Sequence, residues 1–246
     1  MLKAGLGVGA CAALAMMIAS GTANAEIVGS ALRITVTSQA MGEGTFEVSE
    51  KDGSWSGDTW TWRSGSEGIA IKNAQGQTLA TLSNTTMRYI SDPVVSLSFS
   101  LMAGGAGINA SIASGLLSFP SILAEGKASA AVTVTDSDGD GATLTGMASG
   151  GTMYSAHYNG YLGAGTTFAS LGGASLVAGG WDSNSTSGSL GFLPIGVVGD
   201  MSSQFAFSLS PNDQASGTSV WVTQEIPAPG ALALLGVAGL VARRRR

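Results

Sequence analysis

The sequence predicts an all-β chain whose main part is an antiparallel β-sandwich of the jelly-roll or immunoglobulin-like type. Apolar and polar residues alternate in many short segments, as on strands with one face in a core and the other in solvent. These segments recur about every ten residues and are separated by Gly, Asn and Asp, a spacing typical of sandwiches. No central segment keeps a helical period over a dozen residues.

The segment 31–37 shows the alternation clearly, because Leu32, Ile34 and Val36 fall on one face of a strand. In 93–101, valine, leucine and phenylalanine alternate with serine in the same way. The predicted strands are, in order, 31–37, 45–50, 59–63, 69–72, 77–82, 93–101, 131–135, 142–146, 152–158, 166–171, 188–193, 203–209 and 217–223.

Turn residues predict which of these strands form hairpins. Lys51-Asp52-Gly53 predicts a hairpin of 45–50 with 59–63, and Gln75-Gly76 predicts one of 69–72 with 77–82. An Asp-Gly turn predicts a third hairpin, of 131–135 with 142–146, and Asn159-Gly160 predicts a type I′ turn. A glycine-rich run at 103–107 could separate two subdomains, but we expect one continuous sandwich.

The first 25 residues have the features of a secretory signal peptide. Lys3 supplies a positive start, and the segment 4–18 is almost wholly apolar. Ala23-Asn24-Ala25 then matches the small-x-small pattern that signal peptidases accept. The sequence therefore predicts export, with cleavage after Ala25 and a mature N-terminus at Glu26.

The last 20 residues, 227–246, predict a short membrane anchor. Pro227 and Pro229 disfavour helix and separate this tail from the preceding chain. The apolar run 230–242 would cover roughly 20 Å of a hydrocarbon core about 30 Å thick, so it spans only if the bilayer thins or arginine stems snorkel. Arg243, Arg244, Arg245 and Arg246 should stay on the cytoplasmic side, which places the passenger, residues 26–226, outside.

The prolines, the apolar run and the arginine cluster together resemble the PEP-CTERM sorting tail of exported bacterial proteins. Ala228 stands where that tail usually has Glu between its prolines. The resemblance implies transient anchoring in the inner membrane, then cleavage by an exosortase and release to the cell surface or matrix. Similar tails also occur on ice-binding-type secreted proteins. Three stretches of the passenger also resemble uncharacterised PEP-CTERM passengers: 92–99, 140–146 and 209–213.

The charge of the passenger argues against nucleic acid as a partner. It carries all 16 acidic residues and six of the 11 basic ones, a net charge of −10. Such a surface repels phosphate backbones. The single cysteine, Cys11, lies in the signal peptide, so the mature chain has neither disulfide nor thiol nucleophile.

Asp136, Asp138 and Asp140 alternate with Ser137, Gly139 and Gly141 in a loop between two predicted strands. Carboxylate oxygens in a flexible loop suit Ca²⁺, so these three aspartates form a candidate calcium site. An EF-hand loop would need Glu at its twelfth position, where this chain has Met147. The alternative is a turn that uses Asp and Gly for their tolerance of positive φ. We expect no other cofactor.

Trp55, Trp60 and Trp62 lie within eight residues, and aromatic faces could stack on sugar rings. They are therefore candidate glycan contacts. Thr59, Thr61 and Arg63 occupy the alternate positions, which indicates that the tryptophans point into the core instead. Both interpretations remain open at the level of sequence.

The sequence favours a non-enzymatic structural or interaction protein of the cell surface or matrix, with no catalytic residues. Its single histidine, His157, cannot build a multi-histidine metal site, and no G-x-S-x-G motif is present in the passenger. The first alternative is a carbohydrate-binding module that contacts extracellular polysaccharide. The second is a small secreted glycoside hydrolase, which would need a carboxylate pair from acidic residues close in sequence: Glu43, Glu47, Glu50 and Asp58.

Overall fold

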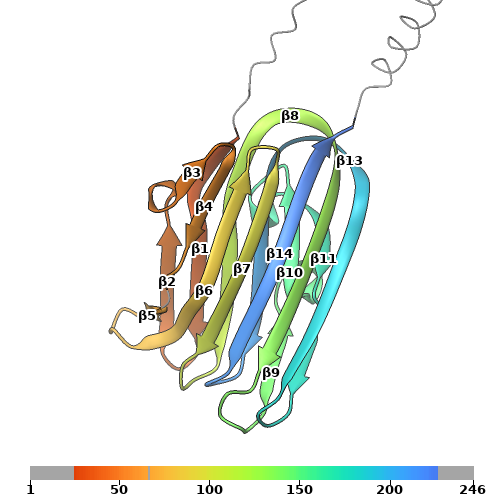
Figure 1. The fold of residues 1–246 in the computed structure, drawn as a ribbon. Helices are drawn as coiled ribbons and strands as arrows, with labels where there is room; N and C mark the ends of the chain where they lie inside the picture. The colour runs from red at the N-terminus through yellow and green to blue at the C-terminus, as the bar shows by residue number, and fades with distance from the viewer. Residues whose placement is uncertain (1–24, 66, 227–246) are drawn as a thin grey trace, which may run out of the picture.

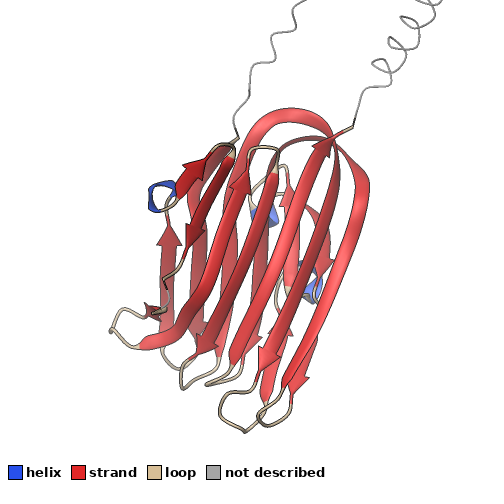
Figure 2. Cartoon of the chain, viewed as in Figure 1, coloured by secondary structure: helices blue, strands red, loops and turns tan. Residues whose placement is uncertain are grey.

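A computed structural model of the chain describes residues 25–65 and 67–226 (Figure 1). This part is an antiparallel β-sandwich, as the sequence predicts, and its helical content is three short 3-10 turns (Figure 2). The strands are β1 (Glu26–Ser38), β2 (Gly42–Val48), β3 (Ser54–Ser56), β4 (Thr59–Arg63), β5 (Ile69–Lys72), β6 (Thr78–Ile90), β7 (Val94–Ala103), β8 (Ile108–Thr135), β9 (Ala142–Gly146), β10 (Tyr154–Tyr158), β11 (Thr166–Leu171), β12 (Ser175–Ala178), β13 (Ser183–Leu209) and β14 (Gln214–Glu225). The 3-10 turns are η1 (Glu50–Asp52), η2 (Ser149–Gly151) and η3 (Leu162–Ala164).

Two long strands, β8 and β13, belong to both layers of the sandwich. The second half of β8 lies between β14 and the first half of β13, and with β7, β6, β4 and β3 these strands form the front sheet. The first half of β8 lies between β1 and the second half of β13, and with β2, β10 and β11 these strands form the back sheet. Both long strands therefore cross from one layer to the other at the same end of the molecule (Figure 1).

The crossing, which we call the arch, is built from residues 118–124 of β8 and 193–200 of β13. Register between the two strands shifts at three places around it, from Leu190 to Asp200. Pro120 and Pro194 lie in this region, and Gly196 takes a φ of +81°. Bulges of this kind bend a strand and increase its twist, which lets each strand turn without ending.

The core between the sheets is aromatic at its centre. Phe99 of the front sheet packs edge-on against Phe205 of the back sheet with ring centroids 5.0 Å apart, and Tyr154 lies 4.9 Å from Phe205. Gly217 faces this cluster, and a Cβ there would lie 2.5 Å from the Phe99 ring. Its missing side chain thus makes room for the ring that joins the layers.

The structure confirms most short strands and the hairpin of β5 with β6, where Gly76 has a φ of +80°. It also shows strands that the sequence pattern did not predict: β3, β12 and residues 108–130 of β8. The segments 188–193 and 203–209, predicted as separate strands, are both part of β13. The run 103–107 connects β7 to β8 within one sandwich and divides nothing.

Three turn predictions were wrong in their partners or length. β2 pairs with β1, and β4 pairs with β3 and β6, so Lys51-Asp52-Gly53 does not join a hairpin. β9 pairs with β12 and β13 rather than with β8, so the aspartate loop crosses between the sheets. β10 and β11 do pair, but through residues 159–165 rather than a two-residue turn, although Asn159 and Gly160 both have positive φ.

Candidate functional site

The outward surface of the front sheet carries rows of small hydroxyl side chains, and we call this surface the front face. Strand register places Ser187, Ala131, Thr218, Ser98 and Thr86 side by side across five strands. One row away lie Ser185, Thr133, Ser216, Ser100 and Ser83, and one row in the other direction lie Ser189, Ser129, Val220, Ser96 and Arg88. Neighbouring strands are about 4.8 Å apart, so the hydroxyls form a two-dimensional array.

Alternation along each strand creates this array. In β14, Ala215, Gly217 and Trp221 point into the core, whereas Ser216 and Thr218 point outward. Because side chains on a strand alternate between faces, the buried pattern fixes the outward pattern with it. Sequence reasoning noted the serine alternation in 93–101 but could not place those serines beside 129–133, 183–189 and 214–218.

A shallow depression of about 520 Å³ lies on the front face across β14, β8 and β13. Small side chains border it, because Ala131 sits in the row between Ser187 and Thr218. The residues that line it are Ser129, Ala130, Ala131, Ser187, Gly188, Ser189, Thr218, Ser219 and Val220. The lining therefore offers hydroxyl donors and acceptors without an acid or a base.

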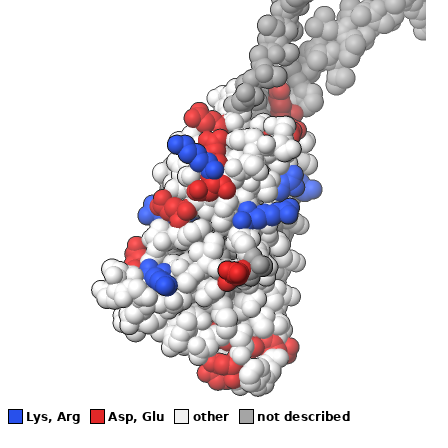
Figure 3. Space-filling view, turned by 60° about the vertical axis from the view of Figure 1, so that its left-hand side comes forward, with Lys and Arg blue, Asp and Glu red and all other residues white. Residues whose placement is uncertain are grey.

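Charged side chains lie at the margins of the front face. Arg63 and Arg88 occupy its β4 and β6 side, and Lys127 occupies its upper end with the amine 5.5 Å from the centre of the Phe192 ring. On the side of the molecule formed by β2 to β4, acidic and basic side chains intermingle over the upper half (Figure 3). The middle of the front face is thus a neutral region on a strongly acidic passenger.

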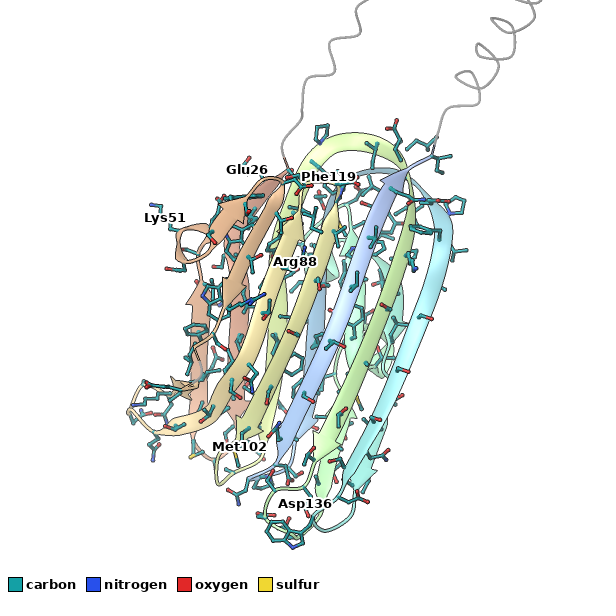
Figure 4. The ribbon with its side chains drawn as sticks, in the orientation of Figure 1. Glu26, Lys51, Arg88, Met102, Phe119 and Asp136 are labelled. Carbon is teal, nitrogen blue, oxygen red and sulfur yellow. The ribbon has the colours of Figure 1, made fainter. Side chains whose placement is uncertain are left out.

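The aspartate loop, residues 136–141, lies at the end of the sandwich opposite the arch, where Asp136 is labelled (Figure 4). Asp136, Asp138 and Asp140 each offer a carboxylate oxygen within 4.8 Å of the other two. Asp136 is buried, and its Oδ1 accepts hydrogen bonds from the backbone N–H of Gly139 (3.0 Å) and Asp138 (3.3 Å). Its Oδ2 accepts from the N–H of Trp181 at 2.5 Å.

These contacts separate the roles of the three carboxylates. Burial opposes ionisation of Asp136, but the N–H groups of Trp181, Gly139 and Asp138 outweigh it and lower the pKa of Asp136 below its usual value. A hydrogen bond with Asp138 and the charge of Asp138 raise the pKa of Asp140. Asp136 therefore holds the loop, and the exposed Asp138 and Asp140 are the carboxylates best placed to meet a cation.

Two neighbouring turns brace the aspartate loop. Asn212 donates from Nδ2 to Asp138 Oδ2 at 3.0 Å, and the buried Asp213 accepts from the N–H of Ser137 at 3.3 Å. Trp181, with a φ of +60°, lies over Gly139, where any Cβ would overlap the indole ring. Sequence reasoning found the three aspartates but missed Asp213, Asn212 and Trp181, which are more than 40 residues away.

The tryptophan cluster does not present three aromatic faces to a ligand. Trp60 is fully buried and donates from Nε1 to the carbonyl of Glu50 at 2.9 Å. The prediction that Trp60 is a candidate glycan contact is therefore wrong, and the prediction that it points into the core is confirmed. Trp62 is half-buried and packs on Phe46 with ring centroids 6.0 Å apart. Trp55 alone of the three is exposed, at 40%, and its Nε1 donates to Glu50 Oε1 at 2.8 Å.

His157 is buried and contacts two hydroxyl side chains. Its Nε2 is 2.8 Å from Ser155 Oγ, and its Nδ1 is 3.4 Å from Thr167 Oγ1. A Ser-His-Asp triad needs a carboxylate at the second ring nitrogen and a serine that substrate can reach, whereas here Thr167 takes that place and Ser155 is buried. Burial lowers the pKa of His157.

The acidic residues near β2 have partners of their own. Glu47 forms an ion pair with Arg33 at 3.3 Å and accepts from Ser30 Oγ at 3.0 Å. Glu50 accepts from Trp55, as described above. These contacts engage two of the four carboxylates that a glycoside hydrolase in this region would draw on.

Fold and surface together define a class: an all-β antiparallel sandwich with a hydroxyl-rich outer face. No protein-family model and no curated protein matches this chain. Among residues 25–65 and 67–226, no helix is long and apolar enough to cross a bilayer, and the predicted signal peptide and tail lie outside this described part apart from Ala25.

Three solved structures show distant similarity. The enzymatically active domain of tailspike protein 4 from bacteriophage CBA120 is 16% identical with a TM-score of 0.26, covering 73% of this chain and 22% of that one. Infectious bursal disease virus, Gx strain, is 10% identical with a TM-score of 0.27, covering 84% and 63%. An isomalto-dextranase of Arthrobacter globiformis T6 in complex with panose is 10% identical with a TM-score of 0.20, covering 79% and 31%. The chain thus spans less than two thirds of each, and likeness this distant carries no argument about activity.

Proposed function

We propose that the chain is an exported, non-enzymatic protein of the cell surface or extracellular matrix, and that its front face binds a neutral polysaccharide. The observation that carries the proposal is the neutral hydroxyl array around the depression at Ser129, Ser187 and Thr218. In this proposal signal peptidase removes residues 1–25, and the tail 227–246 holds the passenger at the inner membrane until an exosortase-type enzyme releases it.

Hydroxyl groups suit a hydroxylated polymer because each serves as both donor and acceptor. Serine and threonine are short, so ordering them on binding costs less side-chain entropy than ordering Lys, Arg or Gln. The rows run across five strands, so the array offers contacts along an extended chain rather than around a small compact ligand. The charged side chains nearest the array, Arg63, Arg88 and Lys127, are basic, but the net charge of −10 on the whole passenger opposes anionic polymers at long range and favours a neutral one.

Binding fits this surface better than hydrolysis. Glycoside hydrolysis uses two carboxyl groups on either side of the scissile bond. The residues that line the depression carry hydroxyl, methyl and backbone groups and include no Asp or Glu. A polymer lying there would be held by hydrogen bonds with no acid to protonate its glycosidic oxygen.

Trp55 supports a second binding position at the edge of the front sheet. Trp55 is 40% exposed, and the hydrogen bond from its indole Nε1 to Glu50 fixes the orientation of the ring. A fixed, partly exposed indole can stack on a sugar ring. This position would use an aromatic face where the front face would use hydroxyls.

Affinity electrophoresis of the full-length protein tests the proposal, in gels that contain neutral dextran, neutral xylan or anionic alginate. The double variant Ser187→Asp/Thr218→Asp places two charges at the depression and should weaken retardation by a neutral polymer at least tenfold. Thr35→Asp, which places one charge at a depression on the outward face of the back sheet, is the control for added charge away from the front face and should retain binding. Trp55→Ala tests the second position separately.

Equal retardation of the double variant and the wild-type protein would overturn binding at the front face. Retardation by alginate alone would overturn the assignment to neutral polymers. Release of reducing sugar from any of the three polymers by the purified protein would contradict a non-enzymatic role.

A further inference from the structure

The arch carries exposed apolar side chains on its outer surface. Leu123 and Val197 are cross-strand partners there, with 53% and 62% of their surfaces exposed. Their sequence neighbours Ile122 and Val198 pair beneath them, and Val198 is fully buried. Leu193 (46% exposed) and Phe192 (40% exposed) extend the apolar surface along β13. We call Leu123, Val197, Leu193 and Phe192 the apolar rim.

Both ends of the described chain emerge at the arch end of the sandwich (Figure 1). Glu26 pairs with Ser118, at the point where β8 enters the arch. The N–H of Ile226, the last described residue, donates to the carbonyl of Leu123 at 2.8 Å. The chain therefore leaves the sandwich at a member of the apolar rim.

The sequence that follows sets a limit on the distance from this end to the predicted anchor. Five residue steps separate Ile226 from Ala231, the start of the fully apolar stretch 231–242. A fully extended chain covers at most about 3.6 Å per residue, so the arch lies within about 18 Å of that stretch. The headgroup region adds about 5–7 Å on each side of the hydrocarbon core, which leaves little room between the arch and the lipid surface.

We infer that the apolar rim rests on the lipid surface while the tail 227–246 anchors the protein, so that the sandwich stands on the membrane by its arch. The inference goes beyond the proposed polysaccharide binding but rests on the proposed membrane anchoring of the tail. Exposed apolar side chains gain by entering the interface. The Lys127 amine, 5.5 Å from the Phe192 ring centre, can reach a lipid phosphate while the aromatic ring lies at headgroup depth.

This orientation keeps the aspartate loop away from the lipid, whereas Glu26, Glu125, Asp200 and Glu225 lie at the arch end, at the level of the headgroups. The aspartate loop lies at the far end from the arch, as the labels Phe119 and Asp136 show (Figure 4). The front face runs along the sandwich between these ends, so it would project from the membrane with its hydroxyl array free. Lipid contact at the arch and polymer contact at the front face are therefore compatible.

Environment-sensitive dyes on single cysteines test the inference in the full-length chain. Cys11→Ser removes the native thiol, and Leu123→Cys and Val197→Cys report on the apolar rim. Val177→Cys and Met102→Cys are matched controls: both residues are exposed, at 61% and 43%, and lie toward the opposite end. The labelled proteins are reconstituted into phosphatidylcholine vesicles, recovered by flotation and exposed to a lipid-borne quencher.

We expect flotation of all four proteins, with dyes at 123 and 197 quenched at least twofold more strongly than dyes at 177 and 102. Flotation with all four dyes equally exposed to water would overturn contact at the arch and leave anchoring by the tail intact. Failure to float would overturn both, whereas front-face binding in the electrophoresis assay would be unaffected. Quenching at 123 and 197 that grows with the protein-to-lipid ratio would indicate contact between copies and would also overturn the inference.

Discussion

The indole Nε1 of Trp221 donates a hydrogen bond to the backbone carbonyl of His157 at 3.1 Å, across the core from the front sheet to the back sheet. The Trp221 ring also stacks on Phe168 with centroids 4.5 Å apart. Gly126 makes room for the ring, since a Cβ there would lie 2.6 Å from it. One side chain thus joins the two layers by packing and by a buried hydrogen bond.

Trp221→Phe should lower the free energy of unfolding by roughly 1–3 kcal/mol, because it leaves the carbonyl of His157 buried without its donor. Smaller aromatic area adds to the loss. Urea unfolding followed by circular dichroism measures the change. Trp55→Phe removes an exposed hydrogen bond to Glu50 and should change stability by less than about 0.5 kcal/mol. Equal effects of the two variants would contradict the role assigned to Trp221.

Two buried tyrosines should respond differently to loss of their hydroxyls. Tyr89 donates from Oη to the carbonyl of Ala31 at 2.6 Å, whereas the Tyr154 hydroxyl lies near the buried hydroxyls of Ser203 and Ser219 without a contact that has hydrogen-bond geometry. Tyr89→Phe should therefore destabilise by about 1–3 kcal/mol, and Tyr154→Phe should be neutral or stabilising. Tyr154→Phe is the matched control for Tyr89→Phe, because both rings are fully buried and both variants remove one oxygen. A larger loss for Tyr154→Phe would contradict this assignment and show that the Tyr154 hydroxyl is hydrogen-bonded in the folded state, with Ser203 and Ser219 as the neighbouring hydroxyls.

Stability should fall as pH drops below about 6.5, the ordinary pKa of an unfolded histidine. Burial lowers the pKa of His157 in the folded state, so the unfolded chain takes up a proton that the folded chain does not. The stability contributed by the neutral ring is complete above pH 6.5 and is lost as pH falls toward the folded pKa. Melting temperatures between pH 5 and pH 7.5 measure the slope.

His157→Asn is the control for that slope. It removes the only histidine, and histidine is the side chain whose ordinary pKa lies between pH 5 and 8. The variant should be less stable overall but nearly independent of pH between 5 and 7. A slope that persists in His157→Asn would assign the pH dependence to another group.

Calcium should raise the melting temperature if the aspartate loop binds it. Ligand at ten times its Kd stabilises the folded state by about 1.4 kcal/mol, and a domain of this size gains roughly 2–4 °C per kcal/mol. Asp138→Asn should reduce the gain with little loss of stability in chelator, since Asn still suits a turn. Asp136→Asn should lower stability in chelator as well, because three N–H groups depend on its carboxylate. Identical melting temperatures in Ca²⁺, Mg²⁺ and chelator would show that the loop binds no calcium and serves only to connect the two sheets.

Changing Arg243, Arg244, Arg245 and Arg246 together to serine should misorient the unprocessed protein or let it pass through the membrane. Each arginine costs about 2.5–3.5 kcal/mol at the centre of a bilayer, and this cost should keep the native tail end cytoplasmic. Fractionation and protease accessibility of cells report the outcome. Substitution by lysine retains the charges and should preserve the orientation. Unchanged fractionation of the serine variant would show that the arginines do not stop transfer.

Local pattern was sufficient for the fold class and for many elements. The alternation of Leu32, Ile34 and Val36 with polar residues requires one buried and one exposed strand face wherever the strand pairs. The same reasoning predicted that Trp60 would point into the core, and it does. The three aspartates at 136–140 were also visible in sequence, because turn-forming residues and metal ligands are read from type and spacing.

Pairing partners, and therefore surfaces, depended on tertiary structure. Residues 108–130 of β8 escaped prediction because Gly115, Pro120 and Gly126 interrupt the alternation, while hydrogen bonds to β1, β13 and β14 keep the segment extended. These long-range hydrogen bonds cannot be predicted from a short stretch of sequence. They place the strands before and after the aspartate loop in different sheets, so the loop connects the two sheets. The same hydrogen bonds place Ser187 and Thr218 on either side of Ala131. They also place Leu123 beside Ile226. A strand's period of two is set by its own backbone, but its neighbour is chosen by which buried faces and registers fit one another across the whole chain.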